Sequence, residues 1–199
     1  PEEKHPSGVN YTHSAAVAAE PKIAVVVPVY NGFSVLLDCV TSLLEYTPKE
    51  VRLLLIDDCS PDPRIGELFG QLKERFAPRL ETCRNETNLG FVRTVNRGFE
   101  LAAGCDVIIL NSDTVVSHRW STLLKLAAYR SDAIGTVSAV SNNSNAFSVP
   151  IKGENPLPPH QTLPQISRMY FQHARNWGPE IHNGHGFCMY IKRALLDDV

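Results

Sequence analysis

Short apolar runs alternate with helical patterns between residues 22 and 140, and this alternation restricts the fold more than any other feature of the sequence. The first run, residues 23–28, is rich in valine and isoleucine and contains no polar side chain, which is typical of a strand buried on both faces. Further strands are expected at residues 51–56, 80–83, 107–110 and 134–140, and helices at 34–44, 65–76, 91–103 and 120–129. Strands that regularly alternate with helices predict an α/β fold, with a mostly parallel, doubly wound sheet and helices on both faces.

The chain divides into three parts by composition. Residues 1–21 are polar and alanine-rich, without the features of a signal peptide, and are expected to form a linker or N-terminal extension. Residues 22–149 carry the α/β alternation, whose first helix is expected to have Ser34 as its N-cap. Residues 150–199 are proline-rich, with one helical segment near 165–175. Because the sequence lacks an initial methionine and stops within a helical pattern, we expect a piece of a longer protein.

Composition excludes several classes of partner. The net charge of −2 gives no electrostatic reason to expect nucleic acid. No apolar run approaches the roughly 18 residues of a membrane-spanning helix, so no membrane segment is expected. The five cysteines are dispersed without C-x-x-C spacing, which indicates free thiols in a reducing compartment. A cytoplasmic location is therefore expected, and any membrane association would come from parts outside this sequence.

Polar loops follow each of the first four expected strands. They comprise residues 30–32, 57–60, 88–90 and 111–113. Because ligands gather at the carboxyl ends of parallel strands, these loops are expected to meet at one edge. Neither G-x-G-x-x-G nor G-x-x-x-x-G-K-[ST] is present to hold phosphates. Carboxylates that face a nucleoside diphosphate need a divalent cation between them, so Asp113 is expected to bind Mn²⁺ or Mg²⁺.

Four motifs in this order resemble the family 2 glycosyltransferases of the GT-A fold: IAVVVPVYNG, LLLIDDCSPD, NETNLGFVRTVNRG and DVIILNSDTVV. The resemblance covers residues 22–140, and GHGFCMYIKR at 184–193 is similar to the next element of the family. It implies an enzyme that transfers a sugar, with inversion, from a nucleoside-diphosphate sugar to an acceptor hydroxyl. Residues 22–149 would then bind the nucleotide sugar, and residues 150–199 would begin the acceptor-binding part.

The resemblance also implies roles for individual residues. Pro28 and Tyr30 would line the base site, and Asp58 would accept a hydrogen bond from the nucleobase imide. Asp113 would be the metal ligand of a D-x-D-like motif. The full set expected to bind the nucleotide sugar is Pro28, Tyr30, Asn31, Asp58, Gly90, Arg93, Asn96, Asn111, Ser112 and Asp113. The residues expected in the sugar or acceptor pocket are Gly184, His185 and Gly186.

Two departures from the family pattern matter. Asn111 is neutral where a carboxylate is commoner, so metal binding is expected to be weaker. The catalytic base of the family lies beyond the position of Val199, so this fragment alone is expected to transfer little or no sugar. Asp197 and Asp198 are not expected to replace it. Asp57 is expected to be structural, and no metal site is expected at His182 and His185.

The implied partners are a UDP, dTDP or GDP sugar and a glycan or lipid-linked acceptor, as in polysaccharide or cell-surface glycan synthesis. Two alternatives remain open at this point. A non-catalytic domain of the same fold would bind ligands without transfer. A sugar-phosphate nucleotidyltransferase has a related sheet, but it needs a glycine-rich basic loop after the first strand, whereas residues 30–33 lead directly into a helix.

Overall fold

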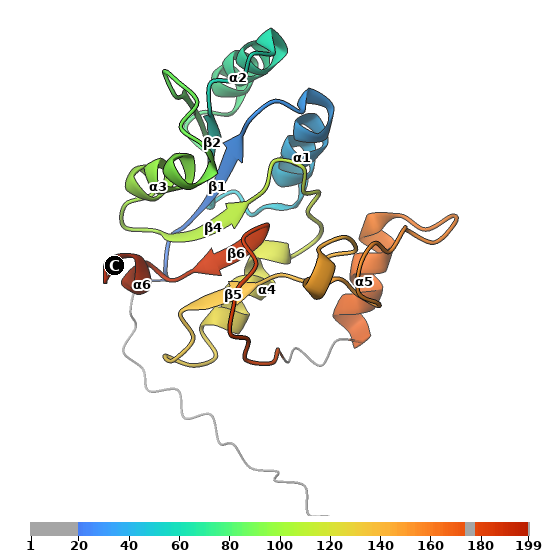
Figure 1. The fold of residues 1–199 in the computed structure, drawn as a ribbon. Coiled ribbons are helices and arrows are strands. Elements are labelled where there is room, and N and C mark those ends of the chain that lie inside the picture. The colour runs from blue at the N-terminus through green and yellow to red at the C-terminus, as the bar shows by residue number, and fades with distance from the viewer. Residues whose placement is uncertain (1–19, 174–177, 199) are drawn as a thin grey trace, which may run out of the picture.

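A computed structural model describes residues 20–173 and 178–198, which form an α/β unit around one six-stranded sheet (Figure 1). The strands are β1 (Ile23–Val29), β2 (Arg52–Asp57), β3 (Leu80–Arg84), β4 (Asp106–Leu110), β5 (Thr136–Ser138) and β6 (Cys188–Ile191). Their order is β3-β2-β1-β4-β6-β5. The first four strands are parallel, and β6 is antiparallel to both of its neighbours. Most of the expected N-terminal extension, residues 1–19, lies outside the described residues.

Helices cover both faces of the sheet, as a doubly wound fold requires (Figure 1). They are α1 (Phe33–Tyr46), α2 (Pro63–Phe76), α3 (Phe91–Leu101), α4 (Trp120–Ala128), α5 (Leu163–His173) and α6 (Arg193–Leu196). Apolar residues of α1, α2 and α4 pack in one core layer, and those of α3 and α6 pack in the other. The predicted mostly parallel α/β sheet is therefore confirmed.

The central strand β1 shows why this arrangement is stable. All seven of its residues are buried. Val25 and Val27 face the layer of α1, whereas Ala24 and Val26 face the layer of α3. Each buried valine contributes on the order of 1.5–3 kcal/mol relative to an exposed one. A strand that is apolar on both faces is stable only between two helical layers, which is what its sequence predicted.

The predicted N-cap of α1 is wrong. The helix begins at Phe33 and its N-cap is Gly32, so Ser34 lies inside the first turn and is exposed. Asn31 and Gly32 have φ values of 59° and 68°, in the left-handed region. These two residues turn the chain sharply at the end of β1. The helix therefore starts before a serine at position 34 can cap it.

The far side of the sheet differs from the regular alternation. The expected strand at 134–140 is shortened to β5, and β6 lies between β4 and β5. Between β5 and β6 the chain leaves the sheet and forms α5, which buries none of its residues (Figure 1). β6 belongs to the same sheet as the earlier strands. The expected boundary at residue 149 stays a prediction. Among the described helices, none has the length and apolarity needed to cross a membrane.

The close contact of α3 with β1 depends on Gly98. A Cβ at this position would lie 2.3 Å from Cγ1 of Val26 and 3.2 Å from Cδ1 of Ile56. We expect Gly98→Ala to destabilise the protein by about 1–3 kcal/mol, because overpacking outweighs the gain in helix propensity. Urea unfolding measures this change in the free energy of unfolding.

Gly70→Ala on α2 is the matched control, because no atom lies within 4 Å of the added Cβ. This variant should be as stable as the wild type or up to about 1 kcal/mol more stable. Equal effects of the two substitutions would contradict the proposed packing of α3 on β1.

Candidate functional site

The loops after β1 and β2 are joined by hydrogen bonds at the carboxyl edge of the sheet. The backbone N–H of Asn31 donates to Oγ of Ser60 at 2.9 Å, and the N–H of Ser60 donates to Oδ1 of Asp57 at 2.8 Å. Pro28 is buried within β1. Tyr30, two residues later, is 53% exposed and leaves its ring free to contact a ligand.

Asp57 ties the second loop to β3. Its carboxylate is 1% exposed and forms an ion pair with Nη1 of Arg84. Nη2 of the same guanidinium donates to the carbonyl oxygen of Ser60 at 2.8 Å. A buried carboxylate that accepts from both Ser60 and Arg84 fixes the positions of the loop after β2 and the end of β3 relative to each other. This is the structural role expected for Asp57.

Asp58 ties the same loop to the start of α3. The residue is 4% exposed, and its Oδ1 accepts from Nδ2 of Asn85 at 2.7 Å and from the N–H of Leu89 at 2.8 Å. Its Oδ2 accepts from the N–H of Gly90 at 2.8 Å. Burial raises the pKa of Asp58, but the hydrogen bonds from Asn85, Leu89, Thr94 and Gly90 outweigh it, so the pKa lies below its ordinary value.

Two consequences follow for the expected nucleotide site. A carboxylate offers about four lone-pair positions, and the hydrogen bonds to Asp58 from Asn85, Leu89, Thr94 and Gly90 already occupy about that number. The role of Asp58 as acceptor for the nucleobase stays a prediction. Gly90 has a φ of 80°, a backbone conformation that favours glycine, and the N–H groups of Leu89 and Gly90 both point at Asp58.

Arg93 and Asn96 lie one turn apart on α3, and both are exposed. The opposite face of the helix carries the buried residues Thr94, Val95 and Gly98. Within the described ranges, no hydrogen bond or ion pair engages the side chain of Arg93 or Asn96. Both side chains therefore remain available to a ligand above the helix.

Asn111, Ser112 and Asp113 form the loop after β4. The N–H of Asn111 donates to the carbonyl oxygen of Phe187 at 2.8 Å, which places the chain before β6 beside this loop. Asn111 and Ser112 are half-buried, whereas Asp113 is exposed. Burial, and then the negative charge of Asp113, raises the pKa of the nearby Cys39 thiol to about 12. No ion pair among the described residues engages the Asp113 carboxylate.

The donor set fits a metal ion that is shared with a ligand. Asp113 offers a carboxylate and Asn111 an amide oxygen, both of which suit Mn²⁺ or Mg²⁺. The described residues contain no cluster of three or more His, Cys, Asp or Glu side chains that could hold a metal alone. Phosphate oxygens and water would have to complete the coordination, as is usual for magnesium.

Gly184, His185 and Gly186 lie beside the Asn111 loop. The N–H of His185 donates to Oγ of Ser138 at 2.8 Å, and its ring lies 5.4 Å from the rings of both Phe147 and Phe187. Nδ1 of His185 is buried and has no hydrogen-bond partner in the described part of the chain. A Cβ on Gly184 would lie 2.9 Å from Sδ of Met189, so a larger residue here would displace the Met189 side chain.

Asp197 and Asp198 are remote from Asp113. Leu110 pairs with Cys188 and Val107 with Ile191, so β6 runs from the carboxyl edge of β4 to its amino edge. Asp197 then follows α6 and pairs with Arg193 at 2.6 Å. The two aspartates lie beyond the amino edge of the sheet, in agreement with the expectation that neither is the catalytic base.

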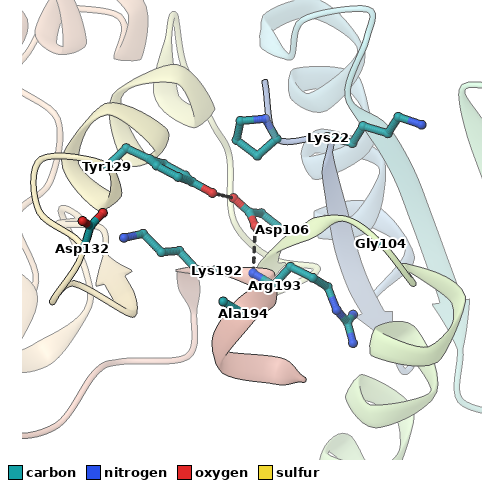
Figure 2. A pocket seen from close by; sticks show the side chains of 9 residues that line it. Lys22, Gly104, Asp106, Tyr129, Asp132, Lys192, Arg193 and Ala194 are labelled. Atoms are coloured by element: carbon teal, nitrogen blue, oxygen red, sulfur yellow. Dashed lines mark hydrogen bonds between the residues drawn. The ribbon is translucent and has the colours of Figure 1, made fainter. Parts of the chain in front are cut away.

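A cavity of about 480 Å³ lies at this opposite edge (Figure 2). Asp106, which is 3% exposed, accepts there from the hydroxyl of Tyr129 at 2.8 Å, from the hydroxyl of Tyr190, and from the N–H of Arg193 at 2.8 Å. Burial and the bond to Asp106 raise the pKa of Tyr129 to about 12. The carboxylate thus anchors α4, β6 and α6 to the start of β4. These bonds serve the fold, and the cavity lies at the edge opposite the polar loops, so it is not the candidate site.

Sequence reasoning missed Arg84 and Asn85. Asn85 is 1% exposed, donates to Asp58 and to Oγ1 of Thr94 at 2.9 Å, and accepts from Arg97. A signal was available, because these are the first polar residues at the end of β3, on the edge where the other loops meet. They attracted no prediction since they belong to a weak strand pattern and precede the recognisable Asn88 and Gly90.

The chain is similar in sequence to known glycosyltransferases. The family described as glycosyl transferase family 2 matches residues 24–199. The glycosyltransferase GlyG of Streptococcus pneumoniae is 30% identical over 111 residues, which are 56% of this chain and 36% of the relative. A PGL/p-HBAD biosynthesis glycosyltransferase of Mycobacterium tuberculosis is 28% identical over 114 residues, which are 56% of this chain and 42% of the relative. The chain therefore spans less than half the length of these relatives.

Solved structures share the fold. The mannosyltransferase PcManGT from Pyrobaculum calidifontis, in complex with GDP-Man and Mn²⁺, has a TM-score of 0.61 at 18% identity and covers 91% of this chain and 47% of its own. GalNAc-T7 with UDP, GalNAc and Mn²⁺ has a TM-score of 0.62 at 18% identity, over 89% and 36% of the two chains. S. aureus TarS with UDP has a TM-score of 0.58 at 20% identity, over 89% and 48%. The expected α/β fold of GT-A type is confirmed.

The buried position of Asp58 predicts a large effect of Asp58→Asn. The amide keeps one acceptor oxygen and places an N–H₂ group against backbone donors, so we expect a loss of about 2–3 kcal/mol near pH 7. Because the folded pKa of Asp58 is lowered, its stabilising contribution is present above the ordinary pKa of 3.8 and disappears as the pH falls through the folded value. Urea unfolding between pH 2.5 and 7 measures both effects.

The variant should lack this part of the acid dependence, so the two proteins should converge in stability below about pH 4. Asp38→Asn, at an exposed position of α1, is the control and should follow the wild type closely. A constant difference between wild type and Asp58→Asn across the acid range would show that the ionised carboxylate does not organise this loop.

Proposed function

This chain belongs to glycosyl transferase family 2, and from this membership we propose that it acts in the transfer of a sugar from a nucleoside-diphosphate sugar to an acceptor hydroxyl. The observation that supports the proposal best is the carboxyl edge of the sheet. There, Asp113 is exposed and has no ion pair among the described residues, beside loops whose other carboxylates are buried and hydrogen-bonded. One available carboxylate next to preorganised loops suits a metal-bound diphosphate.

We assign the nucleoside to the loops after β1 and β2. The exposed ring of Tyr30 would stack on the base, with Pro28 and Asn31 shaping the turn beside it. Asp58 would accept a hydrogen bond from the N–H of a nucleobase imide. Uridine, thymidine and guanosine diphosphates carry such an imide, and UDP or GDP-Man occupies the similar structures.

The diphosphate would lie over the loop after β4, above Gly90. Asp113 would hold Mn²⁺ or Mg²⁺, with Asn111 and Ser112 as neutral neighbours, and the cation would neutralise charge on the departing diphosphate. Arg93 and Asn96, which are exposed on α3, would contact the phosphates or the sugar. Among the described residues, no hydrogen bond or ion pair engages either side chain, so both can offer charge or hydrogen bonds to a ligand.

The sugar and acceptor would meet near Gly184 and Gly186, beside Asn111. Nδ1 of His185, buried and without a partner in the described chain, offers one further hydrogen bond to a substrate hydroxyl. The reaction would be an in-line attack of the acceptor hydroxyl on C1 of the sugar, which inverts that centre. A base would accept the hydroxyl proton, and neither Asp197 nor Asp198 lies on the correct edge for it.

The wider context is also a proposal, since the chain spans less than half of its relatives. Residues 22–149 would bind the donor, and 150–199 would begin the acceptor-binding part. A glycan or lipid-linked acceptor, in polysaccharide or cell-surface glycan synthesis, suits the family. All five cysteines are free thiols, which supports a cytoplasmic location.

Asp113→Ala tests the assignment of the metal. Calorimetric titration with UDP, dTDP and GDP should show binding that is strengthened by Mn²⁺, and the substitution should remove the metal-dependent part, at least about tenfold in affinity. Asp132→Ala is the control, because this carboxylate is exposed but lines the cavity at the opposite edge.

Unchanged affinity of Asp113→Ala in the presence of Mn²⁺ would show that the ligand assignment is wrong. A folded wild-type chain that binds none of the three nucleotides would overturn the donor site as a whole. Nucleotide binding by a full-length protein that neither transfers nor hydrolyses the donor would identify a binding module.

A further inference from the structure

The order of the strands sets the direction in which a nucleoside diphosphate lies along the sheet edge. Asp113 follows β4, and β1, β2 and β3 succeed one another on one side of it. On the other side, β6 is antiparallel, and the chain that leads into it lies against Asn111. A diphosphate at Asp113 therefore extends its nucleoside across β1 and β2, and the outer end of the base points toward β3. Neighbouring strands lie about 4.8 Å apart, so β3 is roughly 14 Å from β4.

Arg84 stands at the end of this path. It is the last residue of β3 and pairs in register with Asp57 of β2. Its Nη1 is held by the carboxylate of Asp57, and its Nη2 donates to the carbonyl oxygen of Ser60 at 2.8 Å. Nη1 of Arg97 donates to the Arg84 carbonyl at 3.2 Å. The guanidinium is thus fixed at two points against the base-side loop, yet 48% of the side chain is exposed.

The fixed guanidinium keeps unused donors. It carries five N–H groups: the contact to Asp57 uses one on Nη1, and the contacts to the Ser60 carbonyl and, at 3.9 Å, to Sγ of Cys59 use the two on Nη2. The remaining two, on Nε and Nη1, are free to donate to an acceptor such as a carbonyl oxygen. Uracil, thymine and guanine present a carbonyl oxygen next to the imide N–H, whereas cytosine and adenine present an amino group there. A donor facing an amino group is repelled and loses its water without replacement.

We propose that Arg84 determines the specificity for the nucleobase, by donating to the carbonyl oxygen at its outer end and so selecting oxo bases over amino bases. The inference rests on the proposed function, because it takes the nucleotide to lie on this edge. Asp58 would read the imide N–H, and Arg84 would read the adjacent carbonyl. An acceptor and a donor side by side match that pair of groups.

Arg84→Lys tests the proposal while keeping a positive charge for the buried Asp57. A single ammonium held by Asp57 lacks the fork that spans Ser60 and a ligand together. The dissociation constants of UDP and CDP are measured with Mn²⁺, since the two bases differ at this carbonyl and its neighbouring nitrogen. We expect the wild type to prefer UDP, and the ratio of the two constants to fall by about tenfold in the variant, the loss of one charge-assisted hydrogen bond. The preference contributed by Asp58 should remain.

Arg52→Lys is the matched control. Arg52 also joins β2 to β3 through a carboxylate, Glu81 at 2.8 Å, but at the amino edge of the sheet, so the UDP to CDP ratio should not change. If Arg84→Lys does not fold, the double variant Asp57→Asn with Arg84→Met removes the buried charge and its partner together, and the same fall in the ratio is expected.

Equal weakening of UDP and CDP by Arg84→Lys would overturn the proposal, because it would show that the arginine only holds the loop. A wild type that binds UDP and CDP equally would overturn it as well. A wild type that binds neither nucleotide would instead contradict the proposed function on which the inference rests.

Discussion

Two adjacent buried carboxylates hold the carboxyl edge of this sheet together. Asp57 and Asp58 are 1% and 4% exposed, and burial of a carboxylate costs several kcal/mol unless donors surround it. Asp57 is bonded by Ser60 of its own loop and by Arg84 at the end of β3, whereas Asp58 is bonded by Asn85 and by the start of α3, in the connection that follows β3. The ends of β2 and β3 can therefore have only one arrangement that satisfies both charges. The hydroxyl oxygen of Ser60 accepts a hydrogen bond from the N–H of Asn31, which links the turn after β1 to the same arrangement.

This constraint divides the polar residues of the edge into two groups. The buried carboxylates, with Asn85 and Ser60, form hydrogen bonds within the protein and make the loops rigid. Tyr30, Arg93, Asn96 and Asp113 are exposed on the same edge. The division has a physical basis, since a ligand is bound most strongly by groups that need no rearrangement and whose own protein partners do not compete. The rigid group keeps the loops from rearranging, and the exposed group has no protein partners that compete with a ligand.

The sequence predicted the elements better than the contacts between them. Apolar runs such as β1 are recognisable in the sequence, because a strand buried on both faces has no polar positions. The cap of α1 was wrong since two left-handed residues before it turn the chain too early for Ser34. The place of β6 between β4 and β5 has no local signature, because it depends on pairing between distant segments. The partners of Asp58 were missed for the same reason: two of them are backbone N–H groups, which every residue carries.

In the proposed donor site, the neutral Asn111 has a consequence for how metal and nucleotide would bind. With Asp113 as the one carboxylate of the motif, the protein alone offers the cation a single negative ligand, and a hard cation with one carboxylate remains largely hydrated. The phosphates of the nucleotide bring the missing charge, but they are repelled by Asp113 when no cation is present. The metal therefore strengthens the binding of the diphosphate, and the diphosphate strengthens the binding of the metal by the same factor, as linkage requires. The metal and the diphosphate should bind to this edge as one unit, and both should leave when the diphosphate leaves.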